Sequence, residues 1–236
     1  MGIYKRKIFG IGTGPGDPEL LTLKAIRHLR ESELIFAPTS RGKHLALDTA
    51  LAYVKDKKIL LLSFPMGEVA EEDYRAAAAA IEKACDQLRM TDPQKLPKAA
   101  VLTLGDPLIY STFAHLLPYF QEDSEIEIVS GIPAFLSAAA AAQIPLCQGS
   151  HGLLVQDRWP LNEASEDNLV LLKSSRFQQS DLEEMQSKGY RMTRVSRASL
   201  PEQKITRDFA QLETKEDYLS LLILEKRGDE SGELKP

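Results

Sequence analysis

The sequence has little cysteine and no long apolar run. Cys85 and Cys147 are the only cysteines, and no C-x-x-C pair occurs, so neither a disulfide framework nor a zinc signature is present. The apolar runs are far shorter than the ~18 residues that cross a bilayer. No apolar stretch of signal-peptide length follows the basic residues near Met1. We therefore expect a cytoplasmic protein with no membrane segment and no bound metal.

Positive charge is also in short supply. The chain has 29 lysines and arginines against 34 acidic residues, a formal net charge of -5. A general nucleic-acid binder would show a basic surplus, so we expect no nucleic-acid partner. An anionic small molecule stays possible, because a cleft can be locally basic on an acidic protein. The four histidines are scattered and indicate neither a catalytic triad nor a metal cluster.

Short apolar runs alternate with helical patterns through the first half of the chain. This β-α-β-α order predicts a mostly parallel sheet with helices on its faces. Asp17-Pro18 supplies an N-cap and a favourable first helical residue, and Pro38 is expected to stop the second strand. The predicted strands are Lys7–Ile11, Leu34–Ala37, Ile59–Phe64 and Ala99–Leu104, and the predicted helices are Leu20–Arg30, Leu45–Val54 and Glu71–Leu88.

A proline and a cluster of acids in Leu116–Glu125 predict a domain boundary. We expect an N-terminal α/β domain at residues 1–119 and a C-terminal α/β domain at 120–236. Beyond the boundary the strands come closer together, which favours a mixed sheet. The predicted strands there are Ile126–Val129, Gly152–Gln156, Asn168–Lys173, Tyr190–Ser196, Gln203–Arg207 and Tyr218–Glu225, with helices at Phe135–Ala142 and Asp181–Lys188.

The first predicted strand runs into a glycine-rich loop, residues 10–18 (GIGTGPGDP). The dinucleotide spacing fails, because it would need glycine where Pro15 or Asp17 stands. Asp17 also occupies the helix N-terminus that a pyrophosphate would use. The loop therefore either brings backbone close to a ligand that is not a phosphate, or is a tight turn before a capped helix.

A second such loop contains Gly105-Asp106-Pro107 and follows the predicted strand Ala99–Leu104. Open α/β sheets place their ligands at the carboxyl ends of strands. Gly105 permits close approach of a ligand, Asp106 can accept its hydrogen bonds, and Ser111 and Thr112 add hydroxyls. The alternative is that Asp106 and Pro107 only begin the next helix.

Taken together, Gly10–Ala25 and Gly105-Asp106-Pro107 resemble the tetrapyrrole methylase family. The resemblance covers nearly the whole chain, because four later segments also match: Ser130–Leu146, Leu169–Arg176, Ser196–Ile205 and Tyr218–Lys226. Within the family, Ile109–Phe113 and Arg197–Ile205 look most like the branch that methylates carbon 20 of precorrin-2 or its cobalt-containing counterpart. The chain departs from relatives at residues 130–134 (SGIPA). Pro133 stands where relatives usually have serine or threonine, so one hydroxyl that relatives can offer to the cofactor is lost.

The resemblance implies a homodimeric enzyme that transfers a methyl group from S-adenosylmethionine to a tetrapyrrole in cobalamin biosynthesis. The active site would lie in the cleft between the two domains, where positioning carries most of the catalysis. Asp17 is the candidate general base, with helix capping as its alternative role. Two other functions stay open: methylation at another position or on another macrocycle, such as uroporphyrinogen-III or precorrin-4, and a binding module without turnover.

The resemblance also implies the residues of the site. Gly14, Pro15 and Gly16 would face the substrate. The acetate and propionate groups of a tetrapyrrole need cations, for which the candidates are Arg41, Lys43, Arg158, Arg176 and Arg197. The residues implied for the cofactor are Gly105, Asp106, Pro107, Ile109, Ser111, Thr112, Ala134, Phe135, Leu154, Val155 and Leu200.

Overall fold

The computed structural model describes residues 4–39, 44–64, 69–157, 167–208 and 218–226. The chain divides into two compact units, residues 1–133 and 134–236. The described residues of each unit form one five-stranded sheet, so the prediction of a two-domain α/β protein is confirmed.

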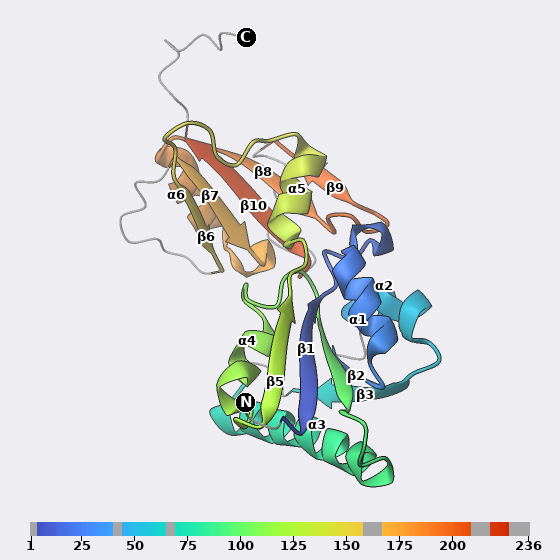
Figure 1. Ribbon diagram of the computed structural model, residues 1–236. Helices are drawn as coiled ribbons and strands as arrows, with labels where there is room; N and C mark the ends of the chain where they lie inside the picture. Colours follow the sequence, from blue (N-terminus) through green and yellow to red (C-terminus); the bar gives the residue numbers. More distant parts are fainter. Residues whose placement is uncertain (1–3, 40–43, 65–68, 158–166, 209–217, 227–236) are drawn as a thin grey trace. The chain divides into compact units, whose positions relative to one another are not determined.

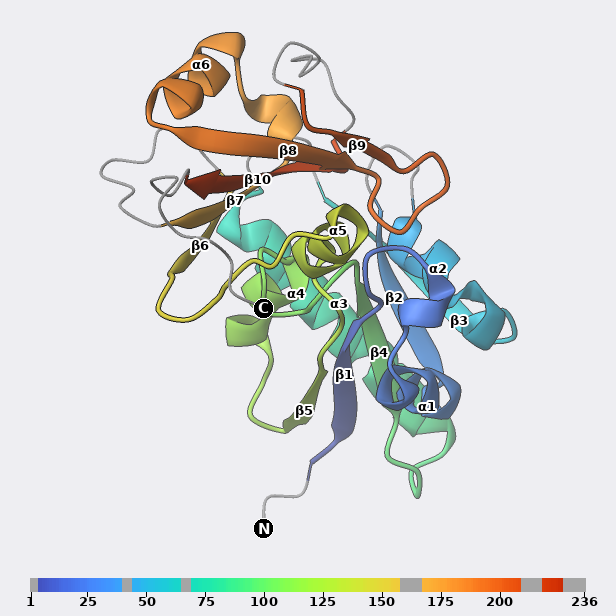
Figure 2. The ribbon, with the colours of Figure 1, turned by 90° about the horizontal axis from the view of Figure 1, so that it is seen from above.

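The sheet of the first unit is entirely parallel and has the strand order β3-β2-β4-β1-β5. Four of these strands, β5, β1, β4 and β2, lie side by side in this order in Figure 2. All five strands therefore end at the same edge. The strands are β1 (Arg6–Gly12), β2 (Leu34–Thr39), β3 (Lys58–Ser63), β4 (Lys98–Thr103) and β5 (Ser124–Val129), and the helices are η1 (Pro18–Leu20), α1 (Leu23–Glu31), α2 (Leu45–Val54), α3 (Glu71–Thr91), α4 (Thr112–Leu116) and η2 (Leu117–Tyr119).

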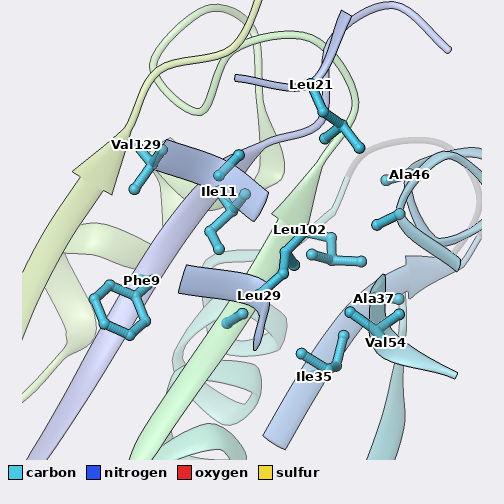
Figure 3. Close-up of a cluster of buried hydrophobic side chains, with 13 residues drawn as sticks. Phe9, Ile11, Leu21, Leu29, Ile35, Ala37, Ala46, Val54, Leu102 and Val129 are labelled. Carbon is cyan, nitrogen blue, oxygen red and sulfur yellow. The ribbon is translucent and has the colours of Figure 1, made fainter. Parts of the chain in front are cut away.

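Helices cover both faces of this parallel sheet because side chains alternate along each strand. Phe9 and Ile11 of β1 pack with α1 and α2 in one buried cluster, drawn in Figure 3. Ile8, the residue before Phe9, points to the opposite face and packs with α3 and α4 in the other cluster. The two clusters hold the sheet rigid beneath the loops at its carboxyl edge.

Two local expectations for the first unit were wrong. The strand predicted to stop at Pro38 continues to Thr39, because pairing with β4 ends at Phe36 and only β3 runs alongside Pro38. The missing N–H of proline is tolerated beside a single partner strand. The helix predicted at Leu20–Arg30 is split into η1 and α1, because Thr22 provides a second N-cap whose hydroxyl accepts the Ala25 N–H at 3.1 Å.

The sheet of the second unit is mixed, as predicted, with the order β6-β7-β10-β8-β9. Strands β6 and β7 are parallel, and the other neighbouring pairs are antiparallel. Buried side chains place α5 on one face and α6 on the other, as Figure 2 shows. The elements, coloured from yellow to red in Figure 1, are α5 (Ala134–Ala142), β6 (Leu153–Gln156), β7 (Asn168–Leu172), η3 (Ser174–Arg176), α6 (Gln179–Ser187), β8 (Tyr190–Ser196), β9 (Lys204–Thr206) and β10 (Ser220–Lys226).

The boundary between the units lies after Pro133 and not after residue 119 as the sequence predicted. Strand β5 is the reason: it pairs with β1 from Arg6↔Ser124 to Ile11↔Val129 and so completes the first sheet. The acidic, proline-containing segment before it is a loop within the first unit.

Among the described residues, no helix combines the length and the apolar character that a membrane crossing requires.

Candidate functional site

The two glycine loops predicted from the sequence are joined to each other at the carboxyl edge of the first sheet. Gly14 and Gly105 form an isolated antiparallel bridge. The Gly105 N–H donates to the Gly14 carbonyl at 2.7 Å, and the Gly14 N–H donates to the Gly105 carbonyl at 3.3 Å. Both glycines have positive φ, +73° and +80°, a region that glycine enters without steric cost. The two loops therefore form one connected structure.

A third loop, which follows β5, joins them. A Cβ on Gly12 would lie 2.4 Å from the Gly131 nitrogen, and a Cβ on Gly131 would lie 2.2 Å from the Gly105 carbonyl oxygen. The atoms that such a Cβ would meet belong to the backbone, which cannot move aside as the end of a flexible side chain can. Only glycine at 12 and 131 therefore allows the three loops to meet. Neither glycine is among the site residues predicted from the sequence, because their role depends on strand order.

The carboxylate of Asp106 fastens these loops. Its Oδ2 accepts the Gly131 N–H at 3.1 Å, and its Oδ1 accepts the Leu108 N–H at 2.9 Å. The sequence left open whether Asp106 binds a ligand or only begins a helix. The geometry gives it a third role, which is to hold the loop after β4 against the loop after β5.

The Ser111 hydroxyl forms hydrogen bonds within the protein. It is buried, its hydroxyl accepts the Ala114 N–H at 3.0 Å as the N-cap of α4, and it donates to the Pro107 carbonyl. These two bonds use the one donor and one of the two acceptor lone pairs of the hydroxyl, and its contact with the cofactor stays a prediction. Thr112, the first residue of α4, is half-buried, and Pro107 is buried.

Three large apolar side chains stand exposed between Pro107 and Ser111. Leu108, Ile109 and Tyr110 keep 54%, 37% and 52% of their surface accessible. Tyr110 also has a φ of +46°, which is rare for a bulky residue and costs energy. Consecutive exposed apolar side chains on a strained backbone are typical of a ligand-binding surface. Ile109 was predicted here, whereas Leu108 and Tyr110 were not.

The first loop carries the residues predicted to face the substrate. Gly14 and Pro15 are buried, and Gly16 is half-buried. Asp17 caps η1, since its Oδ1 accepts the Glu19 N–H at 2.9 Å. The buried Thr49 hydroxyl of α2 lies 3.2 Å from the Gly16 carbonyl and ties the loop to that helix.

The predicted residues of the second unit fall on separate elements. Ala134 is exposed at the start of α5, and Phe135 is buried in the core with α5 and the sheet. Leu154 and Val155 are half-buried neighbours in β6 that pack on opposite faces. Leu200 is half-buried in the turn between β8 and β9.

The predicted cations of the second unit are partly paired. Arg176 lies 3.6 Å from the Asp157 carboxylate. Arg197 donates through Nε to the Pro201 carbonyl at 3.2 Å. The other three predicted cations, Arg41, Lys43 and Arg158, lie outside the described residues.

The chemistry of the first unit's loop edge is apolar and weakly acidic. In residues 10–17 and 104–112 the only charged side chains are Asp17 and Asp106. Such a surface suits a neutral or cationic ligand that contacts backbone and apolar side chains, and it disfavours phosphate. Within the described part of the chain, no group of three or more His, Cys, Asp and Glu side chains could hold a metal ion.

Comparison with known proteins gives consistent matches over most of the chain. A probable cobalt-precorrin-2 C(20)-methyltransferase of Methanocaldococcus jannaschii is 30% identical over 230 residues, covering 94% of this chain and 96% of that protein. The cobalt-precorrin-2 C(20)-methyltransferase of Salmonella typhimurium is 30% identical over 71% of this chain and 72% of that protein.

Solved structures share the fold. A uroporphyrin-III C-methyltransferase from Thermus thermophilus, complexed with S-adenosyl homocysteine, matches with a TM-score of 0.63 and 23% identity, covering 93% of this chain and 97% of that one. The family model of the tetrapyrrole (corrin/porphyrin) methylases matches residues 7–212. The chain belongs to the tetrapyrrole methylase family.

Proposed function

We propose that this protein transfers the methyl group of S-adenosylmethionine to carbon 20 of precorrin-2 or its cobalt-containing form, in cobalamin biosynthesis. The observation that carries the proposal is the union of three loops through Gly12, Gly105 and Gly131 at the carboxyl edge of the first sheet. The similarity to two C(20)-methyltransferases supports the choice of carbon and macrocycle.

The loop edge fits the proposed methyl donor. The donor combines a flat, largely apolar adenine with a positively charged sulfonium. Exposed Leu108, Ile109 and Tyr110 offer apolar contact area, and no cation stands in residues 104–112 to repel the sulfonium. When bound, S-adenosylmethionine supplies an already activated methyl group, so no protein nucleophile is needed.

The chain's own residues then bind, orient and exclude water. Asp106 keeps the loops after β4 and β5 at a fixed distance. Holding donor and acceptor in reacting geometry can contribute on the order of 7–11 kcal/mol of a barrier. We propose that backbone of Gly105–Pro107 and the side chains of Ile109 and Thr112 contact the donor. From the second unit we propose Ala134, Phe135, Leu154, Val155 and Leu200 for the donor.

We propose that Gly14, Pro15 and Gly16 face the macrocycle, and that Arg41, Lys43, Arg158, Arg176 and Arg197 supply cations to its carboxylates. Asp17 is the proposed acceptor of a proton after methyl transfer. Its Oδ1 caps η1, and in the described residues its Oδ2 accepts no hydrogen bond, so one oxygen stays available.

A labelling experiment tests the activity. Purified protein is incubated with methyl-labelled S-adenosylmethionine and precorrin-2, with and without cobalt, and the product is located by NMR. Label at carbon 20 is expected. Label at another carbon would assign a different regiospecificity, and binding of both compounds without transfer would make the protein a binding module.

A matched pair of tyrosine variants tests the donor surface. Tyr110→Ala is expected to weaken S-adenosylmethionine binding about tenfold in calorimetry, because it removes an exposed aromatic contact. Tyr218→Ala, which removes a tyrosine of similar exposure (57% against 52%) in the second unit, is expected to leave the affinity unchanged. Equal losses in the two variants would contradict the placement of the donor.

We also propose that the enzyme is a homodimer and acts in the cytoplasm. Sedimentation equilibrium of the purified protein, and fractionation of cells that produce it, test the two statements.

A further inference from the structure

The topology of the second sheet gathers the ends of three strands at one edge. Strands β6 and β7 are parallel, and β7 and β8 both run antiparallel to β10, which lies between them. The carboxyl ends of β6, β7 and β8 therefore meet at the edge where β10 begins. Asp157, Lys173 and Arg197 are the residues that directly follow these three strands.

Two cations share one carboxylate at this edge. Lys173 Nζ lies 3.2 Å from Asp157 Oδ2, and Arg176 lies 3.6 Å from the same oxygen. The Asp157 and Lys173 side chains keep only 18% and 23% of their surface, whereas Arg176 keeps 53%. Among the described residues, Lys173 and Arg176 have no other ion pair. Asp157, Lys173 and Arg176 together therefore carry a net positive charge, and the Arg176 side chain exposes it to solvent.

The backbone here is held in an unfavourable conformation. Lys173 has a φ of +56°, and Arg197 and Ser199, beyond the end of β8, have φ of +53° and +59°. Left-handed backbone is uncommon for residues other than glycine, and it gathers at binding and catalytic sites. Buried Ser174 fixes the turn after Lys173, because its hydroxyl donates to Ser220 of β10 at 2.8 Å.

We propose that Lys173, with Arg176, is a carboxylate-binding site at this edge, and that Asp157 neutralises the two cations until a ligand carboxylate takes its place. The ligand class is a ring that carries acetate or propionate groups, so the proposal rests on the proposed function. Lys173 is then a substrate-binding residue in addition to the five cations that the resemblance implied.

Removal of each partner distinguishes this site from a structural ion pair. Lys173→Met and Asp157→Asn both break the same contact, so a purely structural role predicts that both changes act in the same direction. A carboxylate site predicts opposite directions, because one variant loses the cation and the other releases it.

The probe is uroporphyrin III, a flat tetrapyrrole with acetate and propionate groups, titrated by fluorescence at several salt concentrations. Lys173→Met is expected to weaken binding about tenfold and to reduce its salt dependence. Asp157→Asn is expected to tighten binding about threefold. The affinity for S-adenosyl homocysteine, measured by calorimetry, is expected to stay unchanged in both variants.

The control is the ion pair at the opposite edge of the same sheet, where exposed Arg191 of β8 binds Glu225 of β10 at 3.0 Å. Arg191→Met and Glu225→Gln make the same changes in charge and are expected to leave probe affinity unaltered. Loss of affinity in both Lys173→Met and Asp157→Asn, or in neither, would overturn the site while leaving the proposed function standing. Failure of the unmodified protein to bind either uroporphyrin III or precorrin-2 would remove the proposed function, and this site with it.

Discussion

Glycine at position 12 is required by space and not by backbone conformation, which makes it a sharp test of the loop junction. A Cβ there would lie 2.4 Å from backbone nitrogen. We expect Gly12→Ala to lower the free energy of unfolding by about 3 kcal/mol, because neighbouring backbone must move. Urea unfolding followed by circular dichroism measures the change.

Gly149→Ala is the control for that variant. Gly149 has a φ of +57° and nothing within 4 Å of a built Cβ, so alanine there meets only the cost of a left-handed backbone, about 1 kcal/mol. Equal losses in the two variants would contradict the close meeting of the loops.

The two cysteines differ in their surroundings and should differ in reactivity. Cys85 is fully buried among α3 and the sheet, and burial raises the pKa of its thiol to about 12. Cys147 is exposed. Because the thiolate is the reactive form, a maleimide at pH 8 is expected to label one thiol in the folded protein and two in urea. Cys147→Ser is expected to abolish labelling of the folded protein, and Cys85→Ser to leave it intact.

At the scale of elements, charged pairs connect strand β5 to its neighbours. Glu127 of β5 lies 2.8 Å from Lys24 of α1 and 3.0 Å from Lys7 of β1. Hydrogen bonds from Lys24 and then Lys7 lower the pKa of Glu127 from 4.5 to about 2. A lowered carboxyl pKa means that the unfolded chain binds a proton more readily. The stabilisation is therefore complete above pH 4.5 and is lost as the pH falls toward 2.

Glu127→Gln tests this linkage. The variant is expected to be less stable than the unmodified protein at pH 7 and to lose less stability between pH 4.5 and 2, as measured by urea midpoints across that range. Glu122→Gln, which removes an exposed carboxylate in the same unit, is expected to keep the original pH profile. Parallel profiles for Glu127→Gln and the unmodified protein would show that the pairs contribute nothing.

The elements themselves were largely predictable from the sequence, because periodicity and end signals are local. Helix α2 at Leu45–Val54 and strand β8 at Tyr190–Ser196 have the predicted bounds. The split between η1 and α1 was missed because two capping residues, Asp17 and Thr22, compete within a few positions.

The site was only half predictable for a physical reason. The motif at Gly105-Asp106-Pro107 was recognisable, but the partners of Asp106 and of Gly14 are fixed by which strands are neighbours. Strand order is a long-range property that no local pattern encodes. The active-site cleft between the two domains stays a prediction for the same reason.

For the whole molecule, the place of β5 decides which part of the chain can fold alone. Residues 1–133 contain the complete parallel sheet and both of its buried clusters. We expect this fragment to unfold cooperatively in urea. Residues 1–119 lack Val129 of one cluster, and they lack Ser124, whose hydroxyl bonds the buried Arg6 and Glu82.

The shorter fragment is therefore expected to show no cooperative transition. The buried Arg6–Glu82 ion pair loses the Ser124 hydroxyl that bonds both side chains, and β1 loses β5 as a partner strand. Circular dichroism and amide exchange of the two fragments measure the difference. A cooperative transition with the same midpoint in residues 1–119 would instead support the domain boundary predicted from the sequence, after residue 119.

The reciprocal hydrogen bonds between Gly14 and Gly105 have a consequence for how relatives of this protein can diverge. A change that displaces one of the bridged turns displaces the other, so we expect the affinities for donor and acceptor, which we proposed for these two turns, to change together. New preferences for a methylation position should then arise in side chains that project from the turns, as at Leu108 and Tyr110, while the glycines between them stay fixed.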